Sequence, residues 1–157
     1  MTDKTNCVHH VVWCIRPESL EPARRFWQEA VGLPLQDLDL PELGLHVLIS
    51  WEGGIEIMAP VYDTGTLVDS ARRFLATHGE GVYSVVFNVA DIEDVVARIA
   101  RQGGRLVFEE TIRPEEVDER ELTVAGDSRE PFAIQQALFD PIFGMRICLQ
   151  QLTPEAK

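Results

Sequence analysis

The chain of 157 residues contains two copies of one sequence pattern. A short apolar strand and a helix-like run extend from His10 to Gly32, and the same pattern recurs from Ser84 to Gly103, at an offset of 74 residues. Each copy continues into further strand-like segments, so the repeating unit is predicted to be β-α-β-β-β. A repeat of this kind limits the fold to similar modules that bury their apolar faces together.

The elements of the two copies can be placed from periodicity and end signals. Apolar residues at helical spacing predict a helix over 92–100, with Asp91 as its N-terminal cap and Gly103 at its end. A looser stripe predicts a helix over 20–31, and a third helix over 66–78 links the copies. Other strands are expected at Leu45–Trp51, Ile55–Met58, Ala133–Phe139 and Met145–Gln151. The whole chain is expected to be one domain, with a first module at 7–60, the linking helix at 61–80 and a second module at 81–152.

Composition excludes several classes of protein. The chain is 45% hydrophobic and 25% charged, as globular proteins are. Its net charge of −12 repels phosphate backbones and anionic membranes, so neither nucleic acid nor a membrane is an expected partner. No apolar run approaches the roughly 18 residues that a membrane helix needs. Three cysteines without a Cys-x-x-Cys spacing suit a reducing compartment, so we expect a cytoplasmic protein.

The excess of acidic residues is concentrated in one segment. An insertion in the second copy, over 109–130, carries nine acidic residues and three arginines, and therefore half of the net charge. Such a charge run is typical of a solvated loop or a short hairpin. A lid over a functional site is the alternative interpretation.

Several segments, taken in order, resemble one family. They are 8–12, 55–60, 71–81, 89–95 and 140–149. Their order and spacing resemble the vicinal oxygen chelate superfamily, which includes glyoxalase I, extradiol dioxygenases and bleomycin-resistance proteins, and within it methylmalonyl-CoA epimerase. The resemblance implies an α+β fold in which two tandem βαβββ modules form a cupped, barrel-like mixed sheet with helices outside.

The resemblance also implies where a metal would bind. In metal-dependent members each copy gives two ligands, one from its first strand and one from its last. The first copy matches with His10 and Glu56, whereas the second has Ser84 and Cys148 at the corresponding positions. A thiol is a soft ligand that suits zinc better than magnesium or cobalt. The cofactor prediction is therefore a divalent metal, with zinc held by His10, Glu56 and Cys148, or no metal at all.

Each candidate residue has a structural alternative. Glu56 lies in an apolar run, where an unpaired charge is costly, so it is expected to have a partner and a role in catalysis. His10 and His46 are the other candidate acid–base residues; a buried, hydrogen-bonded histidine would show the same pattern as His10, and the face of His46 is not determined by the sequence. The candidate ligand-binding residues are Tyr83, Ser84, Cys148, Gln150 and Trp13. The first three of these are also compatible with ordinary strand positions.

Three functions remain open from the sequence. The first is an epimerase, isomerase or lyase that acts next to a carbonyl of a small acid or acyl thioester. The second is a metal-free small-molecule binding protein of the bleomycin-resistance type, which suits an acidic chain. The third is an extradiol-type dioxygenase, which needs two histidines and a carboxylate, of which only His10 and Glu56 stand at matching positions. The family resemblance further implies a homodimer.

Overall fold

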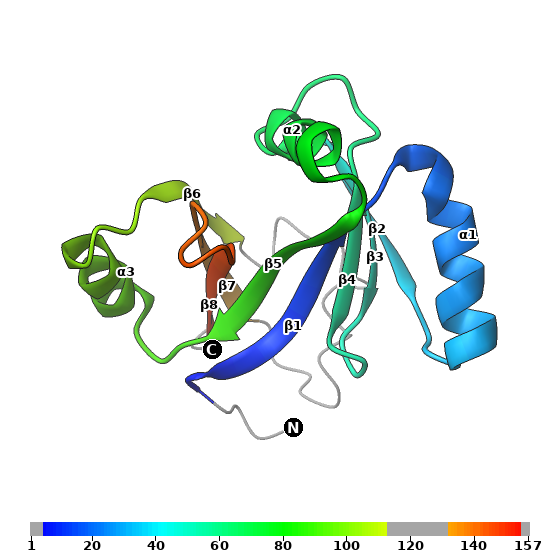
Figure 1. Cartoon of the computed structure of the whole chain (residues 1–157). Coiled ribbons are helices and arrows are strands. Elements are labelled where there is room, and N and C mark those ends of the chain that lie inside the picture. The colour runs from blue at the N-terminus through cyan, green and yellow to red at the C-terminus, as the bar shows by residue number, and fades with distance from the viewer. Residues whose placement is uncertain (1–4, 113–131, 155–157) are drawn as a thin grey trace. The chain divides into compact units, whose positions relative to one another are not determined.

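The computed structural model describes residues 5–112 and 132–154. The chain divides into two compact units, one formed by His10–Tyr83 and the other by Met1–His9 with Ser84–Lys157. Each unit contains a four-stranded mixed sheet and the helix that follows its first strand (Figure 1). The predicted α+β fold of two tandem βαβββ modules is therefore confirmed.

The sheet of the first unit has the strand order β2-β3-β4-β1. Its strands are β1 (Cys7–Cys14), β2 (Gln36–Leu40), β3 (Leu45–Ser50) and β4 (Ile55–Ala59). β2, β3 and β4 form antiparallel hairpins, whereas β4 pairs with β1 in parallel. The parallel pair places the first and last strands of the module side by side, because the intervening chain crosses over through a helix.

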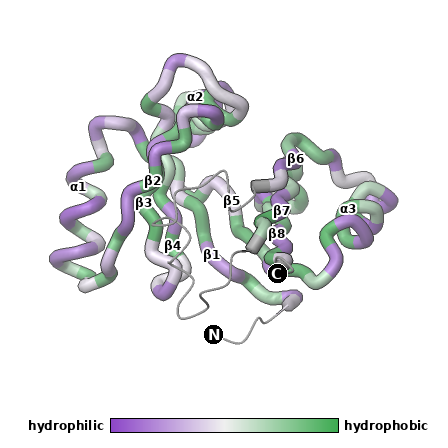
Figure 2. Tube along the Cα trace, turned by 180° about the vertical axis from the view of Figure 1, so that it is seen from behind, coloured by the Kyte–Doolittle hydropathy of each residue, from purple (hydrophilic) through white to green (hydrophobic). Residues whose placement is uncertain are grey.

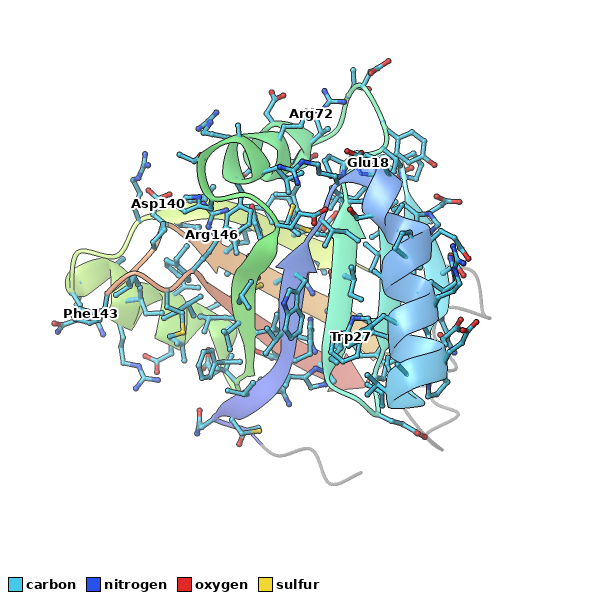
Figure 3. The ribbon with its side chains drawn as sticks, turned by 45° about the vertical axis from the view of Figure 1, so that its right-hand side comes forward. Glu18, Trp27, Arg72, Asp140, Phe143 and Arg146 are labelled. Carbon is cyan, nitrogen blue, oxygen red and sulfur yellow. The ribbon has the colours of Figure 1, made fainter. Side chains whose placement is uncertain are left out.

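Helix α1 (Leu20–Arg25) covers one face of this sheet. It follows a 3-10 turn (Pro17–Ser19) and continues as a π-helical turn (Phe26–Val31) that ends at Gly32, whose φ is +81°. Figure 1 shows α1 beside β2 and β3, and in Figure 3 Trp27 lies on the side of the helix that faces the strands. Trp27 packs against a cluster that includes Leu48 and Ile57, which are 0% and 1% exposed. Burying each of these side chains contributes about 1.5–3 kcal/mol, which holds α1 against the sheet.

The second unit repeats the arrangement with the order β5-β8-β7-β6. Its strands are β5 (Gly81–Asn88), β6 (Leu106–Ile112), β7 (Phe132–Phe139) and β8 (Ile147–Pro154). β5 and β8 are parallel, and β6, β7 and β8 form antiparallel pairs. The two sheets thus share one topology, as the sequence repeat predicts.

Helix α3 (Ile92–Arg101) covers one face of the second sheet. The side chain of Asp91 accepts a hydrogen bond from the backbone N–H of Asp94 at 2.9 Å, which confirms the predicted cap. Gly103 ends the helix region with a φ of +87°. Ile92 belongs to the same buried cluster as Phe139, which is 0% exposed. Figure 2 shows both hydrophobic and hydrophilic residues along α3, as expected of an amphipathic helix with one buried face.

Helix α2 (Val68–His78) links the two modules, and it starts two residues later than predicted. The strands β2 and β6 were not located from the sequence. β2 alternates two aspartates with leucines, a poor strand composition. The predicted insertion over 109–130 begins too early, because Glu109–Ile112 pair with β7 as the end of β6. The rest of that acidic segment lies outside the described residues, and with it the lid interpretation.

Candidate functional site

A hydrogen-bonded histidine and glutamate lie on adjacent strands of the first unit. β1 and β4 are parallel, with Val12 opposite Glu56. His10 precedes Val12 by two residues, so its side chain lies on the same face of the sheet as Glu56. Nε2 of His10 is 3.0 Å from Oε2 of Glu56. The His10 side chain is 2% exposed and that of Glu56 21%, so the imidazole is withdrawn from water while the Glu56 side chain stays partly exposed.

The surroundings of this pair are apolar. On the same face, β3 places Ile49 beside Glu56, and Met58 follows two residues further along β4; these side chains are 2% and 3% exposed. The ring of Trp51 meets that of His10 edge to face, with centroids 5.9 Å apart. A hydrogen bond between ionisable groups is stronger in such low-dielectric surroundings than in water. The sequence expectation that Glu56 needs a partner is met by His10.

This pair can move a proton. A carboxylate accepts a proton, and an imidazole can donate to the carboxylate or share its charge. Because the Glu56 side chain is partly exposed, a small molecule can approach it while the buried His10 orients its carboxylate. The arrangement can therefore act as a general acid–base pair.

The second unit has the same register with different chemistry. Val86 lies opposite Cys148 in the parallel pair of β5 and β8, as Val12 lies opposite Glu56 in the first unit. Ser84 takes the place of His10, two residues before Val86. Ser84 and Cys148 are buried, and so is Gln150, which follows Cys148 on the same face of β8. The repeat predicted that His10 corresponds to Ser84 and Glu56 to Cys148. The strand pairing of the two units confirms this correspondence.

Three predicted site residues lie elsewhere. Trp13 is an odd number of residues from His10, so it lies on the opposite face of β1, where its ring packs 6.0 Å from that of Trp27. His46 pairs with Ala59 on β4. Ala59 is three residues from Glu56 and packs in the cluster under α1, so His46 also lies on the α1 side of the sheet. Tyr83 directs its hydroxyl to the Oγ of Ser70 on α2, at 2.8 Å. The structure does not group these three residues with the His10–Glu56 pair.

His46 belongs to a network that the sequence analysis missed. Its Nδ1 lies 2.8 Å from Asp39 and its Nε2 lies 2.9 Å from Asp37. Asp37 in turn accepts two hydrogen bonds from the guanidinium of Arg24, and Asp39 accepts one from the hydroxyl of Tyr62 at 3.2 Å. The alternation Asp37-Leu38-Asp39 was the available signal, since it places two carboxylates on one face of an edge strand.

The network shifts the ionisation of both aspartates. Hydrogen bonds from Arg24, and then from His46, hold the pKa of Asp37 below its ordinary value. Hydrogen bonds from His46 lower the pKa of Asp39 in the same direction. These charges tie α1 to the β2–β3 edge on the face away from Glu56, so the network's role in the described structure is to hold that edge.

The donor set was compared with the four-ligand metal cage that the family resemblance implies. The first unit offers His10 and Glu56, whose 3.0 Å separation suits neighbouring ligands about 2.1 Å from one ion. The matching positions of the second unit offer a hydroxyl, which is a weak ligand, and a thiol. Within 5–112 and 132–154, no group of three His, Cys, Asp or Glu side chains could hold a metal ion. The residues present do not fit the cage, and zinc on His10, Glu56 and Cys148 stays a prediction.

Comparison with known proteins identifies the family. Residues 9–122 match the Glyoxalase/Bleomycin resistance protein/Dioxygenase superfamily, so the chain belongs to that superfamily. No curated protein sequence matches the chain.

Solved structures show the same fold. A hypothetical protein, BH1468 from Bacillus halodurans C-125, is 19% identical with a TM-score of 0.69, over 98% of this chain and 99% of that one. Methylmalonyl-CoA epimerase from Mycobacterium tuberculosis is 20% identical with a TM-score of 0.63, over 98% and 93% of the two chains. The Streptomyces coelicolor epimerase in complex with 2-nitronate-propionyl-CoA is 17% identical with a TM-score of 0.64, over 94% and 98%. At these identities the likeness establishes the fold alone.

The described helices were also compared with the requirements of a membrane span. Among those within residues 5–112 and 132–154, none is both long enough and apolar enough to cross a bilayer.

Proposed function

We propose that the chain is an isomerase or lyase that moves a proton next to a carbonyl group of a small acid or acyl thioester. Glu56 acts as the base and His10 as its acid–base partner. The observation that carries the proposal is the 3.0 Å contact between the buried ring of His10 and the partly exposed carboxylate of Glu56. Membership of a superfamily whose fold relatives include methylmalonyl-CoA epimerases supports it.

The proposed step is a proton abstraction. Glu56 takes the proton from the carbon next to the carbonyl, and the electron pair of the broken C–H bond moves onto the carbonyl oxygen as an enolate. The hydrogen bond from His10 stabilises and orients the carboxyl group before and after the transfer. Return of a proton from water to the opposite face of that carbon gives epimerisation, whereas departure of a group from the neighbouring carbon with its bonding electron pair gives elimination.

The test is hydrogen exchange in deuterium oxide, with a panel of acyl thioesters and 2-substituted acids followed by mass spectrometry. Wild-type protein is expected to exchange the proton next to the carbonyl. Glu56→Gln keeps the shape but not the basic oxygen, so exchange should fall by about 10²–10⁴-fold. Glu52→Gln, on the exposed turn of the same hairpin, makes the same charge change and should be without effect. Absence of exchange by wild type across the panel, or full exchange by Glu56→Gln, would refute the proposal.

A second candidate is a metal-free small-molecule binding protein. It is favoured by the neutral polar side chains Ser84, Cys148 and Gln150, which occupy the matching face of the second unit. Trp51, whose ring touches that of His10, provides a native fluorescent reporter. Binding of cationic aromatic compounds that changes the fluorescence of wild type but not of Trp51→Phe, without any exchange activity, would favour this candidate. A titration without any change would count against it.

Assembly and location form part of the same proposal. The family resemblance supports a homodimer, and the cysteine content supports a cytoplasmic location. Cys7, Cys14 and Cys148 form no disulfide with one another, which suits a reducing compartment. Analytical ultracentrifugation of the full chain should give twice the mass of 17.7 kDa, and a monomer at every concentration would contradict the dimer.

A further inference from the structure

Three carboxamide side chains lie in a row across three neighbouring strands of the second unit. Asn88 on β5 is in register with Gln150 on β8, and Gln150 is in register with Gln136 on β7. All three lie on the face of the sheet opposite α3, which also carries Ser84 and Cys148. Asn88 is 5% exposed and Gln150 is 0% exposed, whereas Gln136 is partly exposed, so the row is buried at its first two members.

The central amide of the row has an unused donor. Oε1 of Gln150 accepts a long hydrogen bond of 3.4 Å from Nε2 of Gln136. Nε2 of Gln150 is buried, and within residues 5–112 and 132–154 it has no hydrogen-bond acceptor. A buried N–H without an acceptor is destabilising, and such groups are rare in native proteins unless a ligand or water completes them.

A second glutamine pair on the other face of the same strands is different. Gln135 and Gln151 lie opposite each other on β7 and β8. Oε1 of Gln151 accepts a hydrogen bond of 2.7 Å from the backbone N–H of Ile92, at the start of α3, and its Nε2 donates to Thr153 at 3.4 Å. The amide group on the α3 side therefore has structural partners, whereas the donor of Gln150 has none among the residues that the structure describes.

The fold itself does not require amides in this row. In the first unit the positions that correspond to Gln150 and Gln136 are Met58 and Val47, which face each other across β4 and β3. Both are apolar and almost completely buried. Because the same topology accepts apolar residues there, the glutamines are explained by something that needs a hydrogen bond.

We propose that the carboxamide row of the second unit is a ligand-binding subsite, in which an oxygen acceptor of a small molecule receives a hydrogen bond from Nε2 of Gln150. The acceptor is the oxygen of a carbonyl or carboxylate group, because the donor is an amide N–H and the neighbouring Ser84 and Cys148 are neutral. The inference deepens the proposed function, since a carbonyl compound is the substrate class named there, but it requires binding only and no proton transfer.

The test observes the donor directly. Side-chain NH₂ signals of glutamines are resolved by ¹H–¹⁵N NMR, and the signal that Gln150→Met removes is assigned to Gln150. Two probes separate the sources of the acceptor: the propionyl thioester of N-acetylcysteamine offers a neutral carbonyl, and malonate offers carboxylates only. At least one probe is expected to shift the Gln150 signals saturably, while those of Gln135 stay in place.

Affinity and stability supply the second measurement. Gln150→Met preserves length but lacks the donor, so the Kd for the active probe should rise about tenfold, which is 1.4 kcal/mol. Gln135→Met, on the opposite face, should bind as wild type does. Since Gln150 loses an unused donor and only one long hydrogen bond, Gln150→Met should unfold at a temperature equal to or above that of wild type.

The outcomes that overturn the subsite are equally specific. Two of them are Gln150 signals that neither probe shifts and an unchanged Kd in Gln150→Met. The third is magnetisation transfer to the Gln150 NH₂ group from a long-lived bound water that persists with both probes present, because the donor would then be occupied by water. A marked fall in the unfolding temperature of Gln150→Met would show that the donor already has a partner. The subsite and the proton transfer fail separately: binding at Gln150 without exchange refutes only the catalytic proposal, and exchange unaffected by Gln150→Met refutes only the subsite.

Discussion

The contact between His10 and Glu56 should appear as a coupling free energy in a double-mutant cycle. The perturbations are His10→Ala, Glu56→Ala and the double variant. A hydrogen bond between neutral groups is worth about 0.5–1.5 kcal/mol and one to a charged group about 1.5–3 kcal/mol. The exposure of 2% and 21% leaves little screening by solvent. The upper range applies because one partner is a carboxylate, so we expect a coupling of about 2 kcal/mol.

The assay is urea unfolding at neutral pH, followed by circular dichroism. Tryptophan fluorescence is avoided here, since Trp51 touches His10 and would report the substitution itself. In a domain of this size about 1 kcal/mol corresponds to 2–4 °C, so the coupling should also appear as about 4–8 °C in thermal unfolding. A coupling below about 0.5 kcal/mol, with unchanged m-values, would refute the view that the pair is hydrogen-bonded in solution.

Two further predictions concern stability away from the candidate site. The Arg24 guanidinium lowers the pKa of Asp37, so the stability from this contact is present above the unfolded-state pKa near 3.9 and is lost as pH falls through the lowered folded-state pKa. Because Asp37 is half exposed, Asp37→Asn should cost about 1 kcal/mol at neutral pH and weaken the acid dependence of urea unfolding; an unchanged acid dependence would contradict this. Gly65 has a φ of +150°, and a Cβ there would lie 2.1 Å from the backbone nitrogen of Gly44. Gly65→Ala should therefore cost about 3 kcal/mol or more, against about 1–2 kcal/mol for Gly32→Ala, where φ is +81° in the left-handed helical region and nothing lies within 4 Å; equal losses in urea unfolding would count against the packing argument.

The elements that could be predicted are those whose local signals agree with their packing. Helix α3 has an apolar stripe, a capping aspartate and a terminal glycine, and all three serve the ends and the buried face observed. β2 shows the opposite case. Its aspartates oppose strand formation locally, and the strand exists because Asp37 and Asp39 find partners on α1 and β3. Such tertiary contacts are not visible in a local pattern.

The candidate site was predictable in part for a similar reason. The charge of Glu56 in an apolar run required a partner, and the family resemblance placed His10 at the matching position of the first strand. The face of His46 depends on the length of the β3–β4 turn, because one residue more or less would move its side chain to the other side. Trp13 is a different case. Its odd separation from His10 along one strand already places it on the opposite face, so period two alone was sufficient to exclude it from this site.

The internal repeat also provides a control for the cost of the candidate site. A buried histidine–glutamate pair is weak evidence for stability, because replacing such a pair with well-packed neutral residues is often neutral or stabilising. The second unit shows such a replacement: in the same register it has Ser84 and Cys148, both buried, within the same sheet topology. The fold therefore stands without an ionisable pair at these positions. We therefore expect His10 and Glu56 to serve catalysis in the first unit and not its stability. This difference between the two units predicts that Glu56→Gln loses hydrogen exchange into the substrate while its fold stays intact.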